Sequence, residues 1–264
     1  MKLESMTCLC AYAQKYRDYS RRSLRVVLLV LLFVSSTSPA FAQARPSFTD
    51  QVEARVAALV NQFRAENGLQ PLELESRLGE TARYFSAYMA SNGRLDHRAD
   101  GAIPEARATQ HGYDYCVLAE NLAYEYNSRG FAAEQLARSF VQGWKESPLH
   151  RANMLEPDVT ETGLAVARAR LNGEYYAVQM FGRPTTHKVK FSIANRSGAT
   201  VRYEFRKKTL PLAPRQMRSH ESCVGGDVTI DWPYAQEATT IRPRSGGRYV
   251  ITSAGKGPFR VEEE

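Results

Sequence analysis

The spacing of apolar residues changes once along this chain, close to Pro157. Before it, helical spacing predicts long helices over residues 49–67, 76–92 and 131–146. Shorter helices are expected to begin at Pro104 and at Pro148, because proline favours the first helical position. After Pro157, the segments ETGLAVARA and YYAVQMFG flank Asn172-Gly173, which predicts a β-hairpin. This order indicates an α/β fold in which helices pack on an antiparallel sheet.

From Thr185 onward the helical period disappears and polar and apolar residues alternate. The segment HKVKFSIANRSGATVRYEFRKK alternates around a Ser-Gly turn, and GDVTIDW, GGRYVITS and GPFRVEEE are further strand candidates. We therefore expect one mixed domain over residues 43–184 and a small all-β domain over residues 185–264. The second would be a sandwich or an open barrel, with Pro184 at the boundary.

Residues 1–42 have the order of a secretory signal peptide. Three arginines within residues 21–25 precede nine apolar residues, Val26–Val34, and Ala40-Phe41-Ala42 offers a small-x-small cleavage site. A membrane-spanning helix needs about 20 apolar residues, so a cleaved signal is favoured over an uncleaved anchor and no permanent span is expected. The predicted location is therefore extracytoplasmic, either secreted or periplasmic, after cleavage near Ala42.

The positive charge of the chain is concentrated in this leader. Removing residues 1–42 deletes six Lys/Arg and two Asp/Glu, so the formal net charge falls by 4, from +7 to +3. The remaining charge does not predict a strongly basic surface of the kind that binds nucleic acid, so nucleic acid is not an expected partner.

Two cysteines remain after Cys8 and Cys10 leave with the leader. In an oxidising compartment Cys116 and Cys223 could form a disulfide that ties the two halves together. The alternative is two free, buried thiols, and the sequence leaves both open.

Four titratable residues stand out in the first half of the mature chain, namely His97, Glu120, Glu146 and His150. Two histidines with one or two carboxylates suit a divalent cation such as Zn²⁺. Imidazole also serves general acid–base chemistry near neutral pH. The residues are too far apart in sequence to meet unless the fold brings them together. Spacing alone therefore leaves open that each is an ordinary surface or capping residue.

Six segments in order carry a resemblance to a known family. They are FRAENGLQPLELESRLGETARYFSAYM, LDHRADG, AENLAY, WKESPLHRANML, VTETGLAVA and YYAVQMFG. The series is similar to the CAP superfamily of cysteine-rich secretory proteins, antigen 5 and pathogenesis-related 1 proteins, and most of all to its bacterial, SCP-like extracellular branch. The resemblance covers residues 52–183 and implies an α-β-α sandwich with a central groove; the β-rich region lies outside it.

The resemblance also implies that two histidines and two acids line the groove and hold a divalent cation. The positions that match are His97 in LDHR, Glu120 in AENL and His150 in PLHR. The position of the second acid is occupied by Ser147 in this chain. Glu146, one residue earlier, and Glu161 in VTETG are therefore the further candidate groove acids.

These observations support three hypotheses for function. The first is a non-enzymatic module whose groove binds a small molecule, lipid, peptide or other cell-envelope component, with or without the cation. It assigns no catalytic residue, because no nucleophile motif such as G-x-S-x-G is present. The second is a metal-dependent hydrolase, a protease or cell-wall-degrading enzyme, that uses the same groove. The third is an envelope adaptor with purely structural histidines. An envelope component or protein is the expected partner of the β domain.

Overall fold

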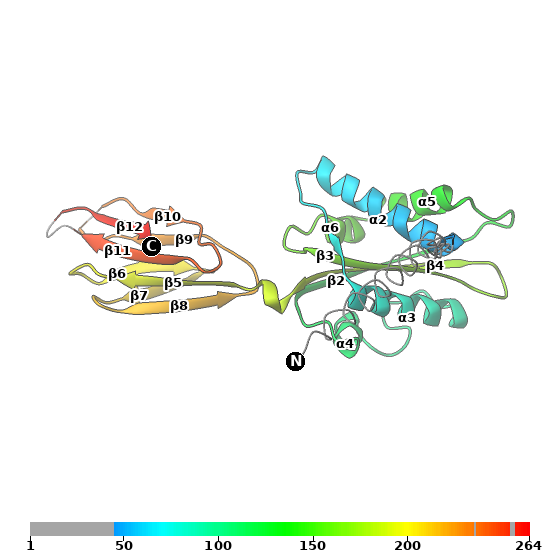
Figure 1. The fold of residues 1–264 in the computed structure, drawn as a ribbon, viewed down its shortest axis with the longest axis horizontal. Helices are drawn as coiled ribbons and strands as arrows, with labels where there is room; N and C mark the ends of the chain where they lie inside the picture. Colours follow the sequence, from blue (N-terminus) through cyan, green and yellow to red (C-terminus); the bar gives the residue numbers. More distant parts are fainter. Residues whose placement is uncertain (1–44, 235, 254–256) are drawn as a thin grey trace, which may run out of the picture. The chain divides into compact units, whose positions relative to one another are not determined.

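The computed structural model describes residues 45–264 except 235 and 254–256, so the predicted signal peptide and its cleavage site lie outside the described residues. The first part of the described chain contains a sheet with the strand order β1-β3-β4-β2 (Figure 1). Its strands are β1 (Glu73–Leu74), β2 (Tyr115–Glu125), β3 (Glu161–Arg168) and β4 (Tyr175–Pro184). β1 runs parallel to β3, and the other neighbours are antiparallel. β2 therefore forms one edge of this sheet.

Helices cover both faces of the sheet. They are α2 (Phe48–Glu66), α3 (Ser76–Asn92), α4 (Pro104–Gln110), α5 (Ala133–Glu146) and α6 (Pro148–Met154). Helices α2, α5 and α6 lie on one face, and α3 and α4 lie on the other (Figure 1). Val56 and Trp144 belong to the core under the first group, whereas Phe85 and Tyr113 belong to the core under the second. The predicted α-β-α sandwich is confirmed.

Local capping residues set the ends of the first two helices. α2 begins with a capping box, in which the Ser47 hydroxyl accepts from the backbone N–H of Asp50 while the Asp50 carboxylate accepts from that of Ser47. α3 spans the predicted residues 76–92 and ends at Gly93, whose φ of 62° is the left-handed conformation that suits glycine.

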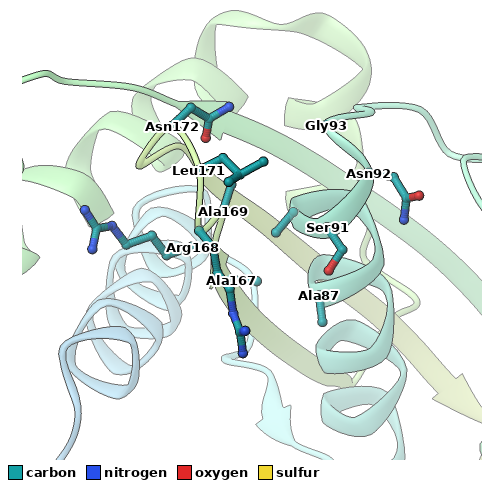
Figure 2. A pocket seen from close by; sticks show the side chains of 11 residues that line it. Ala87, Ser91, Asn92, Gly93, Ala167, Arg168, Ala169, Leu171 and Asn172 are labelled. Carbon is teal, nitrogen blue, oxygen red and sulfur yellow. The ribbon is translucent and has the colours of Figure 1, made fainter.

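β3 and β4 form the predicted hairpin, with Gly173 at a φ of 74° after Asn172. Another glycine, Gly163, lets α3 pack directly against β3. A Cβ atom at Gly163 would lie 2.1 Å from the backbone nitrogen of Gly79. Between the C-terminal end of α3 and the hairpin loop lies a pocket of about 730 Å³ (Figure 2).

The second part of the described chain consists of strands arranged in two sheets, with orders β10-β9-β6-β7 and β12-β11-β5-β8. The elements are η1 (Thr185–His187), β5 (Val189–Asn195), β6 (Val201–Phe205), β7 (Lys208–Leu212), β8 (Met217–Ser222), β9 (Val228–Asp231), β10 (Thr239–Ile241), β11 (Arg248–Ser253) and β12 (Phe259–Glu263). Both sheets contribute to one core, for example through Phe191 of β5 and Tyr203 of β6. The expected small β domain is thus a two-sheet sandwich. The boundary at Pro184 stays a prediction.

A disulfide joins Cys116 in β2 to Cys223, which follows β8, with the two Cα atoms 5.1 Å apart. The thiols that the sequence left open are therefore paired. Arg183 Nε also donates to the carbonyl oxygen of Cys223 at 2.8 Å. The cysteines are 107 residues apart in sequence, and closing a loop of this length stabilises a fold by about 2–4 kcal/mol relative to the reduced chain.

The hydrophobic cores are built from residues between Phe48 and Val261. The chain from Pro46 onward accordingly forms a compact unit with its own cores. Within the part of the chain that the structure describes, no helix is both long and apolar enough to cross a membrane.

Candidate functional site

The candidate site lies at the edge strand β2, where Glu120 and Asn121 are consecutive. Successive side chains of a strand point to opposite faces of a sheet. Glu120 accordingly bonds to Arg107 of α4, on one face. Asn121 bonds to the backbone of α6, on the other face. This strand thus connects two groups of helices that approach its edge from opposite sides.

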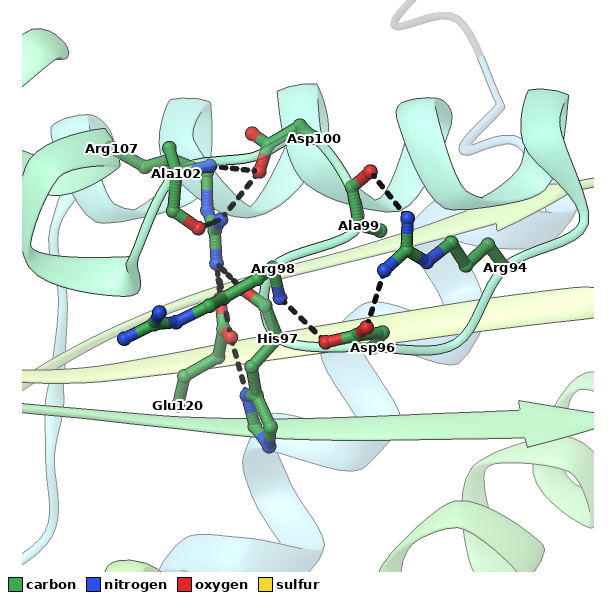
Figure 3. Close-up of polar contacts among 9 residues, drawn as sticks. All are labelled: Arg94, Asp96, His97, Arg98, Ala99, Asp100, Ala102, Arg107 and Glu120. Carbon is green, nitrogen blue, oxygen red and sulfur yellow. Dashed lines mark hydrogen bonds and ion pairs between the residues drawn. The ribbon is translucent and has the colours of Figure 1, made fainter.

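Arg107 clamps the carboxylate of Glu120 in a buried ion pair (Figure 3). Its Nη2 atom donates to both carboxylate oxygens, at 3.1 and 2.9 Å, and its Nη1 atom pairs with Asp100 at 2.9 Å. The side chain of Glu120 is 1% exposed and that of Arg107 is 0% exposed. Buried carboxylates require such partners, since an unpaired buried charge is strongly destabilising. Sequence reasoning identified Glu120 but missed both Arg107 and Asp100.

His97, in the loop after α3, is held by the same carboxylate. Its Nδ1 atom lies 2.7 Å from Glu120 Oε1. A proton on Nδ1 that is donated to Glu120 fixes the imidazole tautomer and leaves Nε2 with its lone pair, as in carboxylate–histidine pairs behind metal ions. Figure 3 shows the second ring nitrogen pointing away from Glu120. The hydrogen bond that His97 donates to Glu120 raises the pKa of His97, and partial burial opposes this rise.

His150 lies on α6, on the other side of the β2 edge. Ser147 takes the N-cap position of this helix and Pro148 the first helical position, although the Ser147 hydroxyl makes no capping hydrogen bond. Asn121 Nδ2 donates to the carbonyl oxygen of His150 at 3.0 Å, which fixes the start of α6 against β2. Burial lowers the pKa of His150, and the positive charge of His97 lowers it further.

The other two candidate acids have different partners. Glu146 is exposed and accepts a hydrogen bond from Gln142 of its own helix at 2.7 Å. Glu161 accepts from the hydroxyl of Tyr113 at 2.6 Å, on β3 rather than on the β2 edge. The role of Glu146 and Glu161 as further groove acids stays a prediction.

The donor set differs from the predicted three metal ligands. Among the residues that the structure describes, no group of three or more His, Cys, Asp or Glu side chains is arranged to hold a metal ion. Glu120 is turned toward His97 and Arg107, so it orients a histidine instead of presenting a free lone pair. The remaining donors are Nε2 of His97 and the imidazole of His150. A histidine oriented by a carboxylate, as His97 is by Glu120, is typical of the ligands in zinc sites, and cation binding by His97 and His150 stays a prediction.

The comparison with family models agrees with this architecture. Residues 57–181 match the model described as the cysteine-rich secretory protein family, CAP. This segment is a CAP domain. It contains His97, Glu120 and His150 and lies within the stretch 52–183 on which the motifs predicted the resemblance.

Known CAP-domain relatives and neighbours are similar to this chain at low identity. The uncharacterized protein YkwD of Bacillus subtilis (strain 168) is 26% identical over 156 residues, which are 56% of this chain and 56% of the relative. This chain thus spans about half the length of that relative. An extracellular protein containing an SCP domain from Bacillus anthracis is 21% identical, with a TM-score of 0.43 over 51% of this chain and 41% of that one. The structure of NaASP2 with Zn²⁺ is 12% identical, with a TM-score of 0.37 over 53% of this chain and 83% of that one.

Proposed function

We propose that this chain is an exported binding protein that holds a cell-envelope component, a lipid or a peptide, beside His97 and His150, with a divalent cation shared by the two imidazoles. The observation that supports this most is the buried sequence of contacts from Arg107 to Glu120 to His97. Arg107 also binds Asp100 and backbone carbonyl oxygens, and the carboxylate that it holds is the one that orients the half-exposed ring of His97.

The two histidines are suited to binding in complementary ways. Burial and the charge of His97 keep His150 neutral at neutral pH, so its lone pair is available to a ligand. His97 has a raised pKa, and a cation would compete with the proton on its Nε2 atom. A bound Zn²⁺ would supply a Lewis-acidic centre with open positions for water or ligand oxygen. Glu120 and Arg107 would then keep the His97 ring in one orientation.

Binding is favoured over catalysis because the sequence carries no nucleophile motif beside this pair. The extracytoplasmic location follows from the signal-like leader, and the paired cysteines suit an oxidising compartment. The β sandwich would provide a second surface, for an envelope or protein partner, because the CAP site does not involve it.

Calorimetric titration with Zn²⁺ tests this proposal on the chain from residue 43 onward. We expect measurable binding by the wild type and its loss in His97→Ala and in His150→Ala. His111→Ala is the matched control, since His111 follows α4 and makes no contact with either histidine among the contacts described above. Absence of binding by the wild type, or equal binding by all four proteins, would reject the shared cation. Extraction of the purified protein with organic solvent, followed by mass spectrometry, would then identify a directly bound ligand.

A metal-dependent hydrolase is the second candidate, and the opposite pKa shifts of His97 and His150 favour it. Two neighbouring groups whose pKa values are pushed apart are typical of an acid and a base. Hydrolysis of casein or peptidoglycan by the wild type, with loss of activity in both histidine variants and retention in His111→Ala, would support this reading. Equal rates in all four proteins would exclude it.

A further inference from the structure

The loop at the tip of the β3–β4 hairpin contains a leucine whose side chain is not buried in a core of the domain. The side chain of Leu171 is 102% exposed. Arg168 and Arg170 precede it, and neither forms an ion pair within the described part of the chain. A single exposed leucine is common on protein surfaces. Leu171 becomes informative together with these two arginines, the pocket and the aromatic side chains beside it.

The pocket of about 730 Å³ opens beside this loop (Figure 2). Alanines from α3 and from the β3 end form its apolar part, namely Ala87, Ala90, Ala167 and Ala169. Polar groups of Asn92 and Asn172 and the two arginines also line it. An apolar floor with amide and guanidinium groups around it suits an amphipathic molecule that carries a negative charge.

Aromatic side chains gather at the same end of the CAP domain. The strand register pairs Glu125 with Tyr175, so Tyr124 and Tyr126 lie next to the hairpin. Tyr126 is 53% exposed, and Arg129 follows it in the loop to α5. Two acids at this end already have partners: Glu174 accepts hydrogen bonds from the hydroxyls of Tyr124 and Tyr176, and Glu125 accepts one from Ser139. Tyrosine and arginine beside an exposed leucine are typical of surfaces that lie at a membrane interface.

The described chain also begins at this end. Phe48, at the start of α2, packs against Tyr175 with the ring centroids 5.7 Å apart. The start of α2 therefore lies at the same end of the sheet as Tyr126.

We propose that Tyr126, Arg129, Arg168, Arg170, Leu171 and Asn172 form a contact surface for an anionic lipid bilayer, which we call the hairpin-end surface. Leu171 and Tyr126 enter the interfacial region, the arginines pair with lipid phosphates, and the pocket accepts part of one lipid. The hairpin-end surface is independent of the proposed histidine site, because none of its residues contacts His97 or His150 in the described contacts.

Vesicle flotation tests this proposal with the chain from residue 43 onward, which keeps every described element and lacks the apolar run. Vesicles of phosphatidylcholine containing about one third phosphatidylglycerol are compared with pure phosphatidylcholine. We expect binding to the anionic vesicles only, and weaker binding at high salt. Because each arginine near an anionic surface contributes about 1 kcal/mol, Arg170→Gln should weaken binding about fivefold. Leu171→Ser should weaken it at least as much.

Matched controls keep the outcome interpretable. Leu149→Ser removes another exposed leucine, 79% exposed on α6, and Arg202→Gln removes an exposed arginine of β6. Both should bind like the wild type, and all four variants should unfold at the wild-type temperature. No binding to anionic vesicles, or binding that Arg170→Gln and Leu171→Ser leave unchanged, would overturn the proposal.

Discussion

Each face of the CAP sheet buries one arginine, and the two arginines have different partners. Arg64 of α2 is 1% exposed and donates to backbone carbonyl oxygens of Gln70, Met154 and Glu156, at 2.9, 2.8 and 3.0 Å. Arg107 of α4 is also 1% exposed, yet it donates to the carboxylates of Asp100 and Glu120. The first arginine binds neutral acceptors, and the second balances two negative charges.

The difference separates a structural role from a functional one. Arg64 satisfies carbonyl groups at the end of α6 and in neighbouring loops, which otherwise lack donors. The described hydrogen bonds of the Arg64 side chain all go to backbone carbonyl oxygens. Arg107 acts on a carboxylate that in turn binds His97, so a change at Arg107 is transmitted to an imidazole that reaches the surface. The face with α3 and α4 therefore positions the site, and the face with α2, α5 and α6 holds its second histidine in place.

Replacement of Arg107 should have the largest effect. Arg107→Met leaves two carboxylates buried without their cation, and removing one partner of a buried ion pair costs about 3–5 kcal/mol. Urea denaturation at neutral pH measures this loss in the free energy of unfolding. Arg202→Met, at an exposed position, is the control and should stay within about 0.5 kcal/mol of the wild type. A smaller loss of unfolding free energy in Arg107→Met than in Arg64→Met would contradict the expectation that the buried ion pairs of Arg107 matter more than the carbonyl contacts of Arg64.

Arg64→Met should be the next most damaging change. It leaves carbonyl oxygens without a donor but no unpaired charge, so we expect a loss of about 2 kcal/mol. The same urea experiment measures it. Histidine resonances in an NMR titration sharpen the comparison, because the pKa of His97 should remain at its wild-type value in this variant. A change in that pKa would show that the two faces are coupled.

Asn121→Ala should cost about 1–2 kcal/mol, since it removes a buried amide that bonds to His150 and Asn153. Its effect on Zn²⁺ binding should exceed its effect on stability, because the amide fixes the backbone at His150. Asn153→Ala is the matched variant. It removes the bonds from Asn153 to Asn121 and to the backbone carbonyl oxygen of Glu120, at 2.9 and 3.2 Å, while leaving the bond from Asn121 to the His150 carbonyl. It should bind Zn²⁺ almost normally, because the backbone at His150 stays fixed. Equal loss of binding in both variants would contradict a positioning role for Asn121.

The sequence predicted those parts of this arrangement that depend on local signals. α3 follows from the apolar spacing and Gly93, and the hairpin follows from Asn172-Gly173. The motif resemblance predicted one site for His97, Glu120 and His150; the structure joins His97 to Glu120, and the place of His150 in the same site stays a prediction. Arg107 escaped detection because PEARATQ looks like an ordinary surface helix, and only the tertiary fold shows that its arginine is buried.

Local sequence patterns also did not indicate which partners Glu146 and Glu161 would contact. Glu161 meets the hydroxyl of Tyr113, which lies 48 residues earlier, and no local pattern links the two. Glu146 remains exposed because α5 ends before its side chain can turn toward His150. Which carboxylate faces which partner depends on how the helices pack on the sheet, and that information is not local.

The smallest expected effect is the pH dependence of stability from the two histidines, which have opposite signs. The pKa of His97 is raised above its ordinary value of 6.5, so its contribution is fully present below pH 6.5 and is lost as the pH rises through the raised pKa. The pKa of His150 is lowered from 6.5, so protonation of the unfolded chain destabilises the fold as the pH falls below 6.5. Because both rings are partly solvated, each contribution should be below about 1 kcal/mol.

The two contributions act on opposite sides of pH 6.5, so the stability of the wild type should be highest near that pH, and each single variant should lack the decline on one side. Urea denaturation of metal-free protein between about pH 5 and pH 8 measures the difference. Relative to the wild type, His97→Gln should lose stability at the acidic end, because the bond between protonated His97 and Glu120 is absent. His150→Gln should gain stability there, because no buried imidazole resists protonation. A shift of both variants in the same direction would contradict the opposite pKa shifts expected from the bond of His97 to Glu120 and from the partial burial of His150.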